Sequence, residues 1–297
     1  FKQKTAYEIS LGLVGSEMCI RDRYRGQIAG IIVEPIAANM GVVVPTMGFL
    51  HEGHLSLVRR AREVGTHVVV SIFVNPMQFN QSTDYDAYPH DKEKDVRLLK
   101  DLETQVLFMP SAKDIYPVGF QSSVEGSEMA KPLCGAARPG HFKGVTTVVA
   151  KLFNMVKPHY AVFGEKDFQQ CTVIRRMVED LNFDVEIVVM PTVREPDGLA
   201  MSSRNARLSE AQRESSLRLF AALSAARQLA DQGQREAAAL LACVRDTLGA
   251  DKALKIEYVS LCDPRTLLDV DQVSGPTRLA IAVWIGNVRL IDNCLVT

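Results

Sequence analysis

From residue 41 to about residue 190, the chain switches repeatedly between two patterns of hydrophobic and polar positions. Short apolar runs are typical of strands that are covered on both faces. They lie at 42–44, 67–74, 105–109, 160–163 and 185–189. Between them, longer stretches carry apolar residues at helical spacing. These lie at 54–65, at 91–103, in a stretch that follows the loop 135–142 and runs through residue 157, and at 164–181. Alternating strands and helices predict an α/β fold with a Rossmann-like, doubly wound parallel sheet that binds ligands at the carboxyl ends of its strands.

The pattern changes after residue 208. Ser209-x-x-Gln212 has the form of a capping box and predicts the start of a long helix. The packed side of that helix is predicted to consist of Leu217, Phe220, Ala221, Ser224 and Leu229. A second helix to about residue 248 and strands at 255–261, 278–285 and 288–293 follow, with Gly286-Asn287 as a hairpin turn. We therefore predict a Rossmann-like domain at 42–205 and a smaller C-terminal α+β lid domain at 206–297.

Residues 1–41 do not fit this pattern. The segment 1–23 has no clear period and resembles a translated adapter or vector sequence. Residues 27–44 resemble a strand and loop of a pyridoxal-phosphate aminotransferase of the glutamate-1-semialdehyde type, but the remainder of that fold is not found. Our hypothesis is a chimeric N-terminal segment, with a genuine extension as the alternative.

Composition narrows the class of protein. Of 297 residues, 47% are hydrophobic and 23% charged, and the formal net charge is -1, which provides no general attraction for nucleic acid or an acidic membrane. Six scattered cysteines without a Cys-x-x-Cys pair indicate reduced thiols. No apolar run approaches the roughly 20 residues that span a bilayer. We expect a cytoplasmic protein without nucleic-acid or membrane partners.

The candidate chemistry centres on residues 44–55. Pro45 and Gly48 should end the first strand, and a helix follows from His54. A helix N-terminus after a glycine-containing loop offers N–H donors to phosphate groups. His51-Glu52-Gly53-His54 resembles the His-x-Gly-His signature of nucleotidyltransferases. The alternative is a pair of metal ligands, but no nearby Cys/His pair completes the roughly four ligands of a structural zinc site.

Several further motifs occur in order along the chain. They are Phe73-Val74-Asn75-Pro76-Met77-Gln78-Phe79, Ala137-Arg138-Pro139-Gly140-His141-Phe142, Phe163-Gly164-Glu165-Lys166-Asp167-Phe168-Gln169-Gln170, the segment Arg194 to Asn205 with Met201-Ser202-Ser203-Arg204, and Arg289-Leu290-Ile291-Asp292-Asn293. Together with Pro45-Thr46-Met47-Gly48 and the two histidines, they resemble the pantoate–β-alanine ligase (pantothenate synthetase) family over residues 45–297.

The resemblance implies an ATP-dependent, AMP-forming ligase. The pantoate carboxylate would attack ATP to give pantoyl adenylate and pyrophosphate, and β-alanine would then displace AMP. Catalytic roles would fall to His54, His51, Lys166 and Arg204. The implied ATP-binding residues are Pro45, Thr46, Met47, Gly48, His51, Gly53, His54, Gly164, Glu165, Lys166, Asp167, Val193, Met201, Ser202, Ser203 and Arg204. His54 would act as a donor or proton carrier on the triphosphate.

The acid substrate would be held by neutral amides, because an amide side chain both donates and accepts hydrogen bonds. The resemblance assigns this role to Gln78 and Gln170, with Asn75 assisting, and less directly to Arg138 and His141. Magnesium is expected with ATP, since Mg²⁺ binds through few carboxylates plus phosphate. Asp95 is a candidate ligand for it, against the alternative of an exposed helix residue. The family resemblance also implies a homodimer.

Two other functions stay open at this stage. Another His-x-Gly-His nucleotidyltransferase, such as a nucleotide-cofactor adenylyltransferase, would share the ATP loop but not the two glutamine motifs. A non-catalytic nucleotide-binding protein is the second alternative, because the atypical N-terminus could leave part of the sheet edge uncovered.

Overall fold

The computed structural model describes residues 41–80, 82–126 and 128–297. The expectation of a chimeric segment at 1–41 therefore lies outside the described residues, apart from Gly41. The chain divides into two compact units, which are described separately below. In described residues, the first unit holds 41–126, 140–163 and 174–190, and the second holds 128–139, 164–173 and 191–297.

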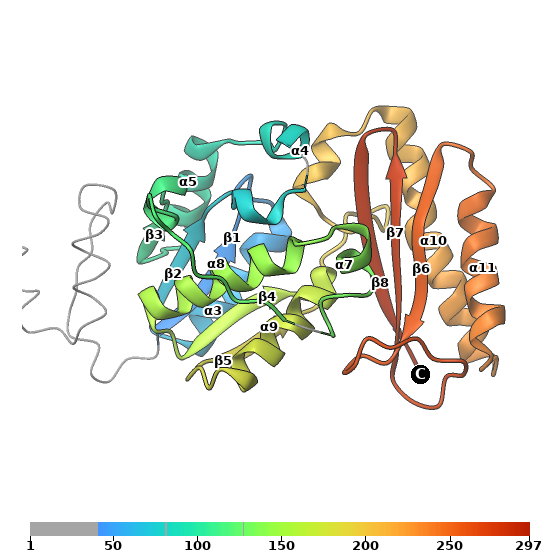
Figure 1. Ribbon diagram of the computed structural model, residues 1–297. Coiled ribbons are helices and arrows are strands. Elements are labelled where there is room, and N and C mark those ends of the chain that lie inside the picture. Colours follow the sequence, from blue (N-terminus) through green and yellow to red (C-terminus); the bar gives the residue numbers. More distant parts are fainter. Residues whose placement is uncertain (1–40, 81, 127) are drawn as a thin grey trace, which may run out of the picture. The chain divides into compact units, whose positions relative to one another are not determined.

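A five-stranded sheet forms the centre of the first unit, which confirms the predicted doubly wound α/β fold (Figure 1). Its strands are β1 (Gly41–Thr46), β2 (His67–Ile72), β3 (Val106–Phe108), β4 (Tyr160–Gly164) and β5 (Glu186–Met190), in the order β3-β2-β1-β4-β5. β1 pairs in parallel with both β2 and β4. The strand order reverses between β1 and β4, so the carboxyl ends of these two strands are where such a fold binds ligands.

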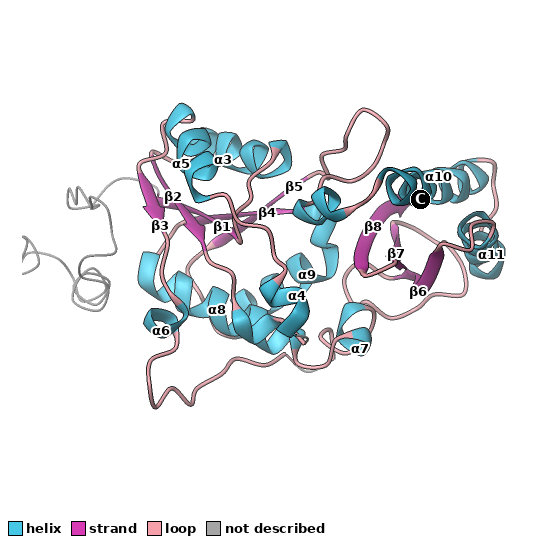
Figure 2. Ribbon diagram, turned by 90° about the horizontal axis from the view of Figure 1, so that it is seen from above, coloured by secondary structure: helices cyan, strands magenta, loops and turns pink. Residues whose placement is uncertain are grey.

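Helices cover both faces of this sheet. α3 (Glu52–Val64) and α5 (Lys92–Asp101) lie on one face, and α8 (His141–Val156) lies on the other (Figure 2). Shorter helices are α4 (Ser82–Asp86), α6 (Ala112–Ile115) and the 3-10 turn η1 (Pro76–Gln78), while α9 (Phe168–Asp180) connects β4 to β5. Val42, Val44 and Val70 are fully buried in the strands, so the apolar runs of the sequence form the core.

The first strand does not stop at Pro45. β1 continues through Pro45 and Thr46, which pair with Ser71 and Ile72 of β2. Pairing of β1 with β4 ends earlier, at Val43. Because the pairing of β1 with β4 ends before Pro45, the missing N–H of the proline removes no ladder hydrogen bond to β4.

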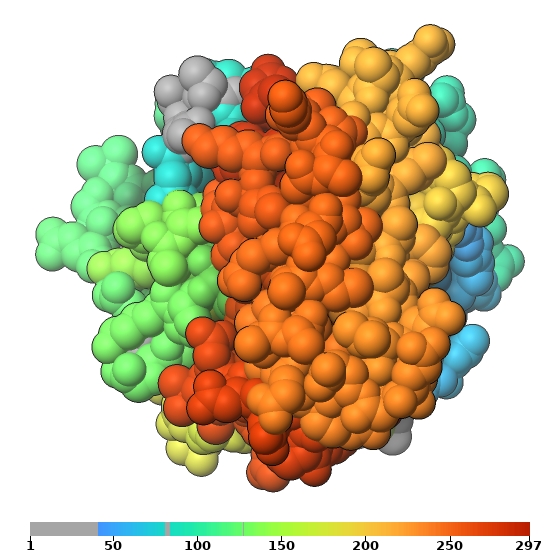
Figure 3. Space-filling model, turned by 90° about the vertical axis from the view of Figure 1, so that its right-hand side faces the viewer, coloured from blue at the N-terminus to red at the C-terminus, as the bar shows by residue number. Residues whose placement is uncertain are grey.

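The second unit contains two helices packed on a three-stranded antiparallel sheet. α10 (Glu210–Asp231) and α11 (Ala237–Gly249) cover β6 (Leu254–Cys262), β7 (Thr277–Ile285) and β8 (Val288–Val296). Figure 3 shows the surface that these two helices form. The predicted hairpin turn joins β7 to β8, with Gly286 at a φ of 58°, and the Ser209–Gln212 capping box begins α10.

The packed face of α10 was predicted wrongly. Phe220, Ala221 and Ser224 are exposed and Leu217 is half-buried, whereas Leu229 packs against the core cluster as predicted. The buried stripe consists of Ser216, Leu219, Ala222, Leu223, Ala226 and Ala230. Alanine and serine occupy four of these six positions, and the stripe joins the core cluster with residues of β6, β7 and β8. The large Phe220 ring instead lies 4.6 Å from the Arg194 guanidinium carbon.

The division into units also differs from the predicted boundary at residue 205. Segments 128–139, 164–173 and 191–205 belong to the second unit. The reason is visible in the side chains of β8, because Asn293 bonds the backbone of Glu165 and Lys166, and Asp292 pairs with Arg194. These loops are bound to the C-terminal sheet, which periodicity alone cannot reveal.

Two further observations concern the cysteines and the helices of the described residues. Cys134, Cys171, Cys243, Cys262 and Cys294 are all free thiols. Within the described part of the chain, no helix has both the length and the apolar character that crossing a membrane requires.

A close approach between α8 and η1 yields a test of the packing. A Cβ built on Gly144 would lie 2.3 Å from the Met77 carbonyl oxygen. We expect Gly144→Ala to lower the free energy of unfolding by about 1–3 kcal/mol, because the backbone must shift. Gly249→Ala is the matched control, since Gly249 also lies in a helix but has open space around its Cβ position. Chemical denaturation of both variants measures the difference, and equal stabilities would contradict the close packing.

Candidate functional site

The loop between β1 and α3 contains two consecutive residues with positive φ angles, a backbone conformation that favours glycine. Gly48 has a φ of 84°, and a Cβ there would lie 2.9 Å from the Ile72 side chain. The next residue, Phe49, also has a positive φ of 50°. Gly48 thus adopts a conformation that glycine tolerates at no steric cost. The turn directs the chain from the end of the sheet to His51, the N-cap of α3.

Asp95 of α5 holds this loop in place. One carboxylate oxygen accepts the Phe49 N–H at 2.8 Å, and the other accepts the Leu50 N–H at 2.7 Å. Asp95 is only 2% exposed, so the alternative of an exposed helix residue is wrong. Because both oxygens already accept backbone N–H groups, the geometry favours a positioning role over the predicted role as a magnesium ligand.

The two histidines lie together at the start of α3, as predicted. Their ring centroids are 4.1 Å apart, and His54 Nδ1 accepts the His51 N–H at 3.4 Å. In the neutral ring this places the remaining proton of His54 on Nε2, which makes that atom a donor. Gly53 lies in the first turn between them. A helix N-terminus with imidazole donors is suited to phosphate oxygens.

A second cluster in the first unit surrounds Asn75, which is 1% exposed. Its amide nitrogen donates to Gln78 Oε1 at 3.2 Å and to the Gly144 carbonyl at 3.0 Å. Its amide oxygen accepts the Met77 N–H and the Tyr116 hydroxyl. Asn75 is therefore engaged on both sides of its amide. It fixes η1 and the Gln78 side chain.

The remaining contacts of this cluster orient Gln78 further. Gln78 Nε2 donates to Met47 Sδ at 2.9 Å, which connects the two predicted ligand segments of this unit. His141 Nδ1 donates to the Gln78 carbonyl at 2.8 Å. Burial raises the pKa of Tyr116, although its hydrogen bond to Asn75 acts in the opposite direction. Tyr116 thus remains a donor at neutral pH.

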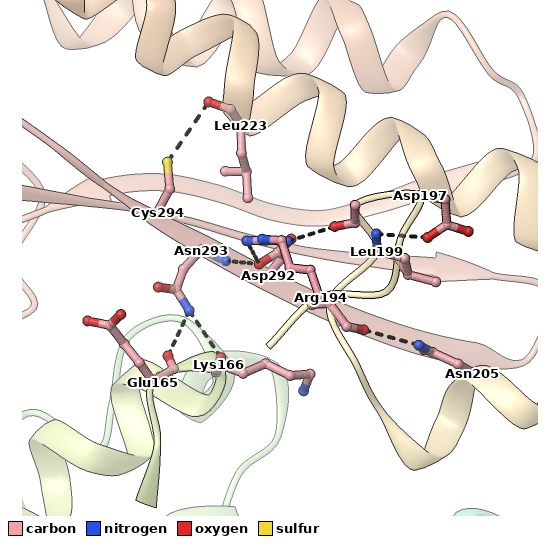
Figure 4. A network of polar contacts seen from close by, with 12 residues as sticks. Glu165, Lys166, Arg194, Asp197, Leu199, Asn205, Leu223, Asp292, Asn293 and Cys294 are labelled. Atoms are coloured by element: carbon pink, nitrogen blue, oxygen red, sulfur yellow. Dashed lines mark hydrogen bonds and ion pairs between the residues drawn. The ribbon is translucent and has the colours of Figure 1, made fainter. Parts of the chain in front are cut away.

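In the second unit, Lys166 lies in the 3-10 turn η2 (Glu165–Asp167), and its side chain is 19% exposed. Its ammonium lies 3.7 Å from the carboxylate of the neighbouring Asp167. Glu165 pairs with Arg278 at 2.7 Å, so its side chain anchors the turn. Asn293 donates to the carbonyls of Glu165 and Lys166 at 3.0 and 3.1 Å (Figure 4).

A small hairpin precedes the predicted serine and arginine segment. Arg194 and Ala200 form an antiparallel bridge, and the Met201 N–H donates to the Val193 carbonyl. Arg194 forms two hydrogen bonds with Asp292, at 2.6 and 2.9 Å (Figure 4). Immediately afterwards comes the 3-10 turn η3 (Ser203–Arg207), whose N-cap Ser202 accepts the Arg204 N–H. Ser203 is 6% exposed.

The tip of this hairpin is held by charge. Arg213 of α10 pairs with both Glu195 and Asp197. Burial acts to raise the pKa of Asp197, but hydrogen bonds from Arg213 and from the Leu199 N–H lower it below its ordinary value. Asn205 donates to Glu195 at 2.7 Å, so the hairpin is connected to η3 as well.

The other predicted substrate ligands are also in the second unit. Gln170 is half-buried near the start of α9, and Arg138 is half-buried directly after the short helix α7 (Cys134–Ala137). The neighbouring Gln169 is 6% exposed and bonds the backbone of Cys134, Met129 and Pro132. Adjacent glutamines therefore differ in role, with Gln169 holding the loop.

Within the first unit, the structure brings Met47 into contact with Gln78 and His51 into contact with His54. Within the second unit, β8 connects the segment of Lys166 with the segment of Arg194. Sequence reasoning missed the positioning residues Asp292, Arg278 and Tyr116, and assigned Asp95 a different role. The only signal for Asp292 and Asn293 was their presence in the last family-like motif.

Comparison with known proteins identifies the family. The chain matches the family described as pantoate–β-alanine ligase over residues 32–295. It is 52% identical over 250 residues to a pantothenate synthetase of Desulfatibacillum aliphaticivorans, covering 84% of this chain and 89% of the relative. It is 51% identical to that of Thermotoga neapolitana, covering 85% and 90% of the two chains.

Solved structures agree with this result. The crystal structure of pantothenate synthetase from Thermus thermophilus matches with a TM-score of 0.85 and 42% identity, covering 95% of this chain and 98% of that one. Pantoate–β-alanine ligase from Francisella tularensis, described as complexed with β-γ ATP and β-alanine, matches with a TM-score of 0.74, 36% identity and coverage of 93% and 95%. This chain belongs to the pantoate–β-alanine ligase family.

Proposed function

We propose that the loop from Pro45 to His54 binds the phosphates of ATP while pantoate is activated. The chain is an ATP-dependent ligase that forms pantothenate from pantoate and β-alanine. One observation supports the proposal most directly. The buried Asp95 fixes the loop backbone so that two adjacent imidazoles stand at the N-terminus of α3, where anions are favoured.

The reaction has two displacements. In the first, a pantoate carboxylate oxygen attacks the α-phosphorus of ATP, the bond from that phosphorus to the bridging oxygen breaks, and pyrophosphate leaves. In the second, the β-alanine amine attacks the acyl carbon, loses a proton, and AMP leaves with the electron pair of the carbon–oxygen bond. Both steps gain most from positioning and from donors placed where negative charge grows.

In this proposal His54 acts as a hydrogen-bond donor, not as a proton carrier. A pantoate carboxylate is already ionised at neutral pH, because carboxyl groups have pKa values near 4. The first displacement therefore requires no general base. What grows on the departing pyrophosphate is negative charge, which the Nε2 proton of His54 and the helix N-terminus can stabilise.

For the second unit we propose further contacts with ATP. Lys166 and Arg204 supply positive charge to the phosphates, and the hydroxyls of Ser202 and Ser203 donate to the same groups. Gly164 leaves room for close approach, since nothing lies within 4 Å of its Cβ position. The remaining predicted contacts are Asp167 with ribose, and the backbones of Val193 and Met201 with the nucleotide.

For pantoate we propose Gln78 and Gln170 as the side chains that bind its hydroxyl and carboxylate oxygens, with Arg138 as an additional contact. Asn75 takes a different role from the one that the resemblance implied. Its amide is engaged by four partners, so it positions Gln78 and does not bind substrate itself.

We propose that Mg²⁺ arrives with ATP as part of the substrate. In the described part of the chain, no three His, Cys, Asp or Glu side chains are grouped as a metal site. In this proposal phosphate oxygens and water hold most of the ion's coordination positions, as is usual for Mg²⁺ bound with a nucleotide. We also propose a cytoplasmic homodimer, on the strength of the family resemblance and the free thiols.

The reaction itself is tested by AMP formation with ATP and magnesium. We expect AMP and pantothenate in equal amounts only when pantoate and β-alanine are both present. Pyrophosphate exchange into ATP should require pantoate but not β-alanine, because the adenylate forms first. Turnover with a nucleotide cofactor in place of pantoate would support the alternative nucleotidyltransferase, and ATP binding without any turnover would support a binding protein.

A pair of variants tests the role of His54. We expect His54→Ala to lower kcat for pantoate-dependent pyrophosphate exchange by about 10²–10³-fold, the usual loss for a transition-state donor. His54→Gln should retain most of the rate, because its amide can still donate from a similar position. An equally large loss in both variants, with wild-type activity following a single ionisation near the histidine pKa, would indicate a proton carrier instead.

Asp95→Asn separates the positioning role from metal binding. The Phe49 and Leu50 N–H groups each need an acceptor, but an amide offers only one oxygen and directs its NH₂ group at the other N–H. The loop should therefore lose its shape. We expect a raised KM for ATP and a lower melting temperature, with the Mg²⁺ concentration for half-maximal rate unchanged. Asp91→Asn is the control on the same helix, because Asp91 only caps α5 and asparagine caps equally well. A shift in the Mg²⁺ requirement of Asp95→Asn alone would restore the ligand assignment.

A further inference from the structure

Two consecutive residues of β8 hold two different loops of the second unit. Asn293 donates to the carbonyls of Glu165 and Lys166, and Asp292 accepts two hydrogen bonds from Arg194 (Figure 4). Adjacent residues of a strand point to opposite sides, so one short stretch of backbone can position two separate segments. Asp292 and Asn293 are 2% and 6% exposed.

The amide of Asn293 has a fixed orientation. Arg278 Nη1 donates to its oxygen at 2.9 Å, so the NH₂ group must face η2. The second terminal nitrogen of Arg278 pairs with the Glu165 carboxylate at 2.7 Å. Arg278 is itself 6% exposed, and its guanidinium carbon lies 4.4 Å from the Phe168 ring. The turn that carries Lys166 is thus bound through its backbone and through one side chain.

The contact of Asp292 serves the other loop. Arg194 bonds both oxygens of Asp292 and also donates to the Gly198 carbonyl at 3.1 Å. The hairpin that these bonds close ends one residue before Ser202. Its position therefore determines the positions of the Ser202 and Ser203 hydroxyls and of Arg204.

We propose that Asp292 and Asn293 are positioning residues for the first half-reaction, with Asn293 placing Lys166 and Asp292 placing the Ser202–Arg204 segment. This inference rests on the proposed contacts of those segments with the ATP phosphates. It implies that disturbing either residue harms formation of the adenylate more than its consumption, because the triphosphate is present only in the first step.

Asn293→Asp tests the inference most sharply. The new carboxylate still accepts a hydrogen bond from Arg278. Its second oxygen, however, replaces the NH₂ group that donates to the two backbone carbonyls, so acceptor would face acceptor. We expect kcat/KM for ATP in pantoate-dependent pyrophosphate exchange to fall by about 10- to 100-fold, the range for a misplaced catalytic group. Conversion of supplied pantoyl adenylate and β-alanine to pantothenate should stay within about threefold of the control.

The control is Val283→Ala. Val283 is a fully buried core residue of β7 that pairs with Ile256 and Leu290, so its truncation destabilises the same sheet away from Asp292 and Asn293 in the strand register. The inference would be overturned if Asn293→Asp exchanged pyrophosphate at the same rate as Val283→Ala. It would also be overturned if Asn293→Asp lost the same fraction of activity in both half-reactions. If Asn293→Asp does not fold, Asn293→Ser keeps one donor and should show a smaller loss of the same half-reaction.

A double variant that combines Asn293→Asp with Lys166→Ala distinguishes action through Lys166 from a purely structural role. If Asn293 acts through Lys166, the double variant should exchange pyrophosphate no more slowly than Lys166→Ala alone. Losses that multiply would contradict the proposal. If the unaltered protein shows no pantoate-dependent pyrophosphate exchange, the proposed function fails and this inference fails with it. If the unaltered protein exchanges pyrophosphate normally but the losses of the two variants multiply, only the inference fails.

Discussion

The structure of the loop between β1 and α3 depends on the two hydrogen bonds between the buried Asp95 carboxylate and the backbone of Phe49 and Leu50. An ionised carboxylate is costly to bury unless donors satisfy its oxygens. Here the donors are N–H groups of a turn that would otherwise lack partners, so each side satisfies the other. The two residues before Leu50 have positive φ angles, a conformation that the loop retains only when its surroundings impose it.

The same principle recurs in the second unit with other chemistry. Asn293 replaces the carboxylate and donates to carbonyls, while the buried Asp292 pairs with the half-buried Arg194. Loss of the arginine would leave the buried carboxylate without its compensating charge, which is more harmful than the loss of a fully exposed ion pair. Loops held in this way need no regular secondary structure of their own, which explains why Lys166 and Ser203 lie in short 3-10 turns.

The sequence was sufficient for the elements and for the motif positions. Apolar runs and helical spacing report burial directly, so β1 to β5 and their helices were predicted with errors of a few residues at their ends. The packed face of α10 was not, because alanine and serine fill its buried stripe and carry little hydrophobic signal, whereas Phe220 stacks on Arg194 outside the core. The roles of Asp95 and Asn293 were also beyond reach. Both act on backbone atoms of residues 45 or more than 120 positions away, and a pattern within the sequence does not encode such partners.

The proposed role of Gln78 as a ligand of the acid substrate bears on which acid the enzyme activates. A nucleotide-cofactor acceptor would bring phosphate groups, for which cationic side chains are the usual ligands. The groups that fix Gln78 are instead the Met47 thioether and the Asn75 amide, both uncharged. Neutral amide partners also leave the electron pairs of the attacking carboxylate oxygen available. A small hydroxy acid bound through amides is therefore the acceptor that this arrangement suits best, and positive charge is more useful on the side of the departing pyrophosphate.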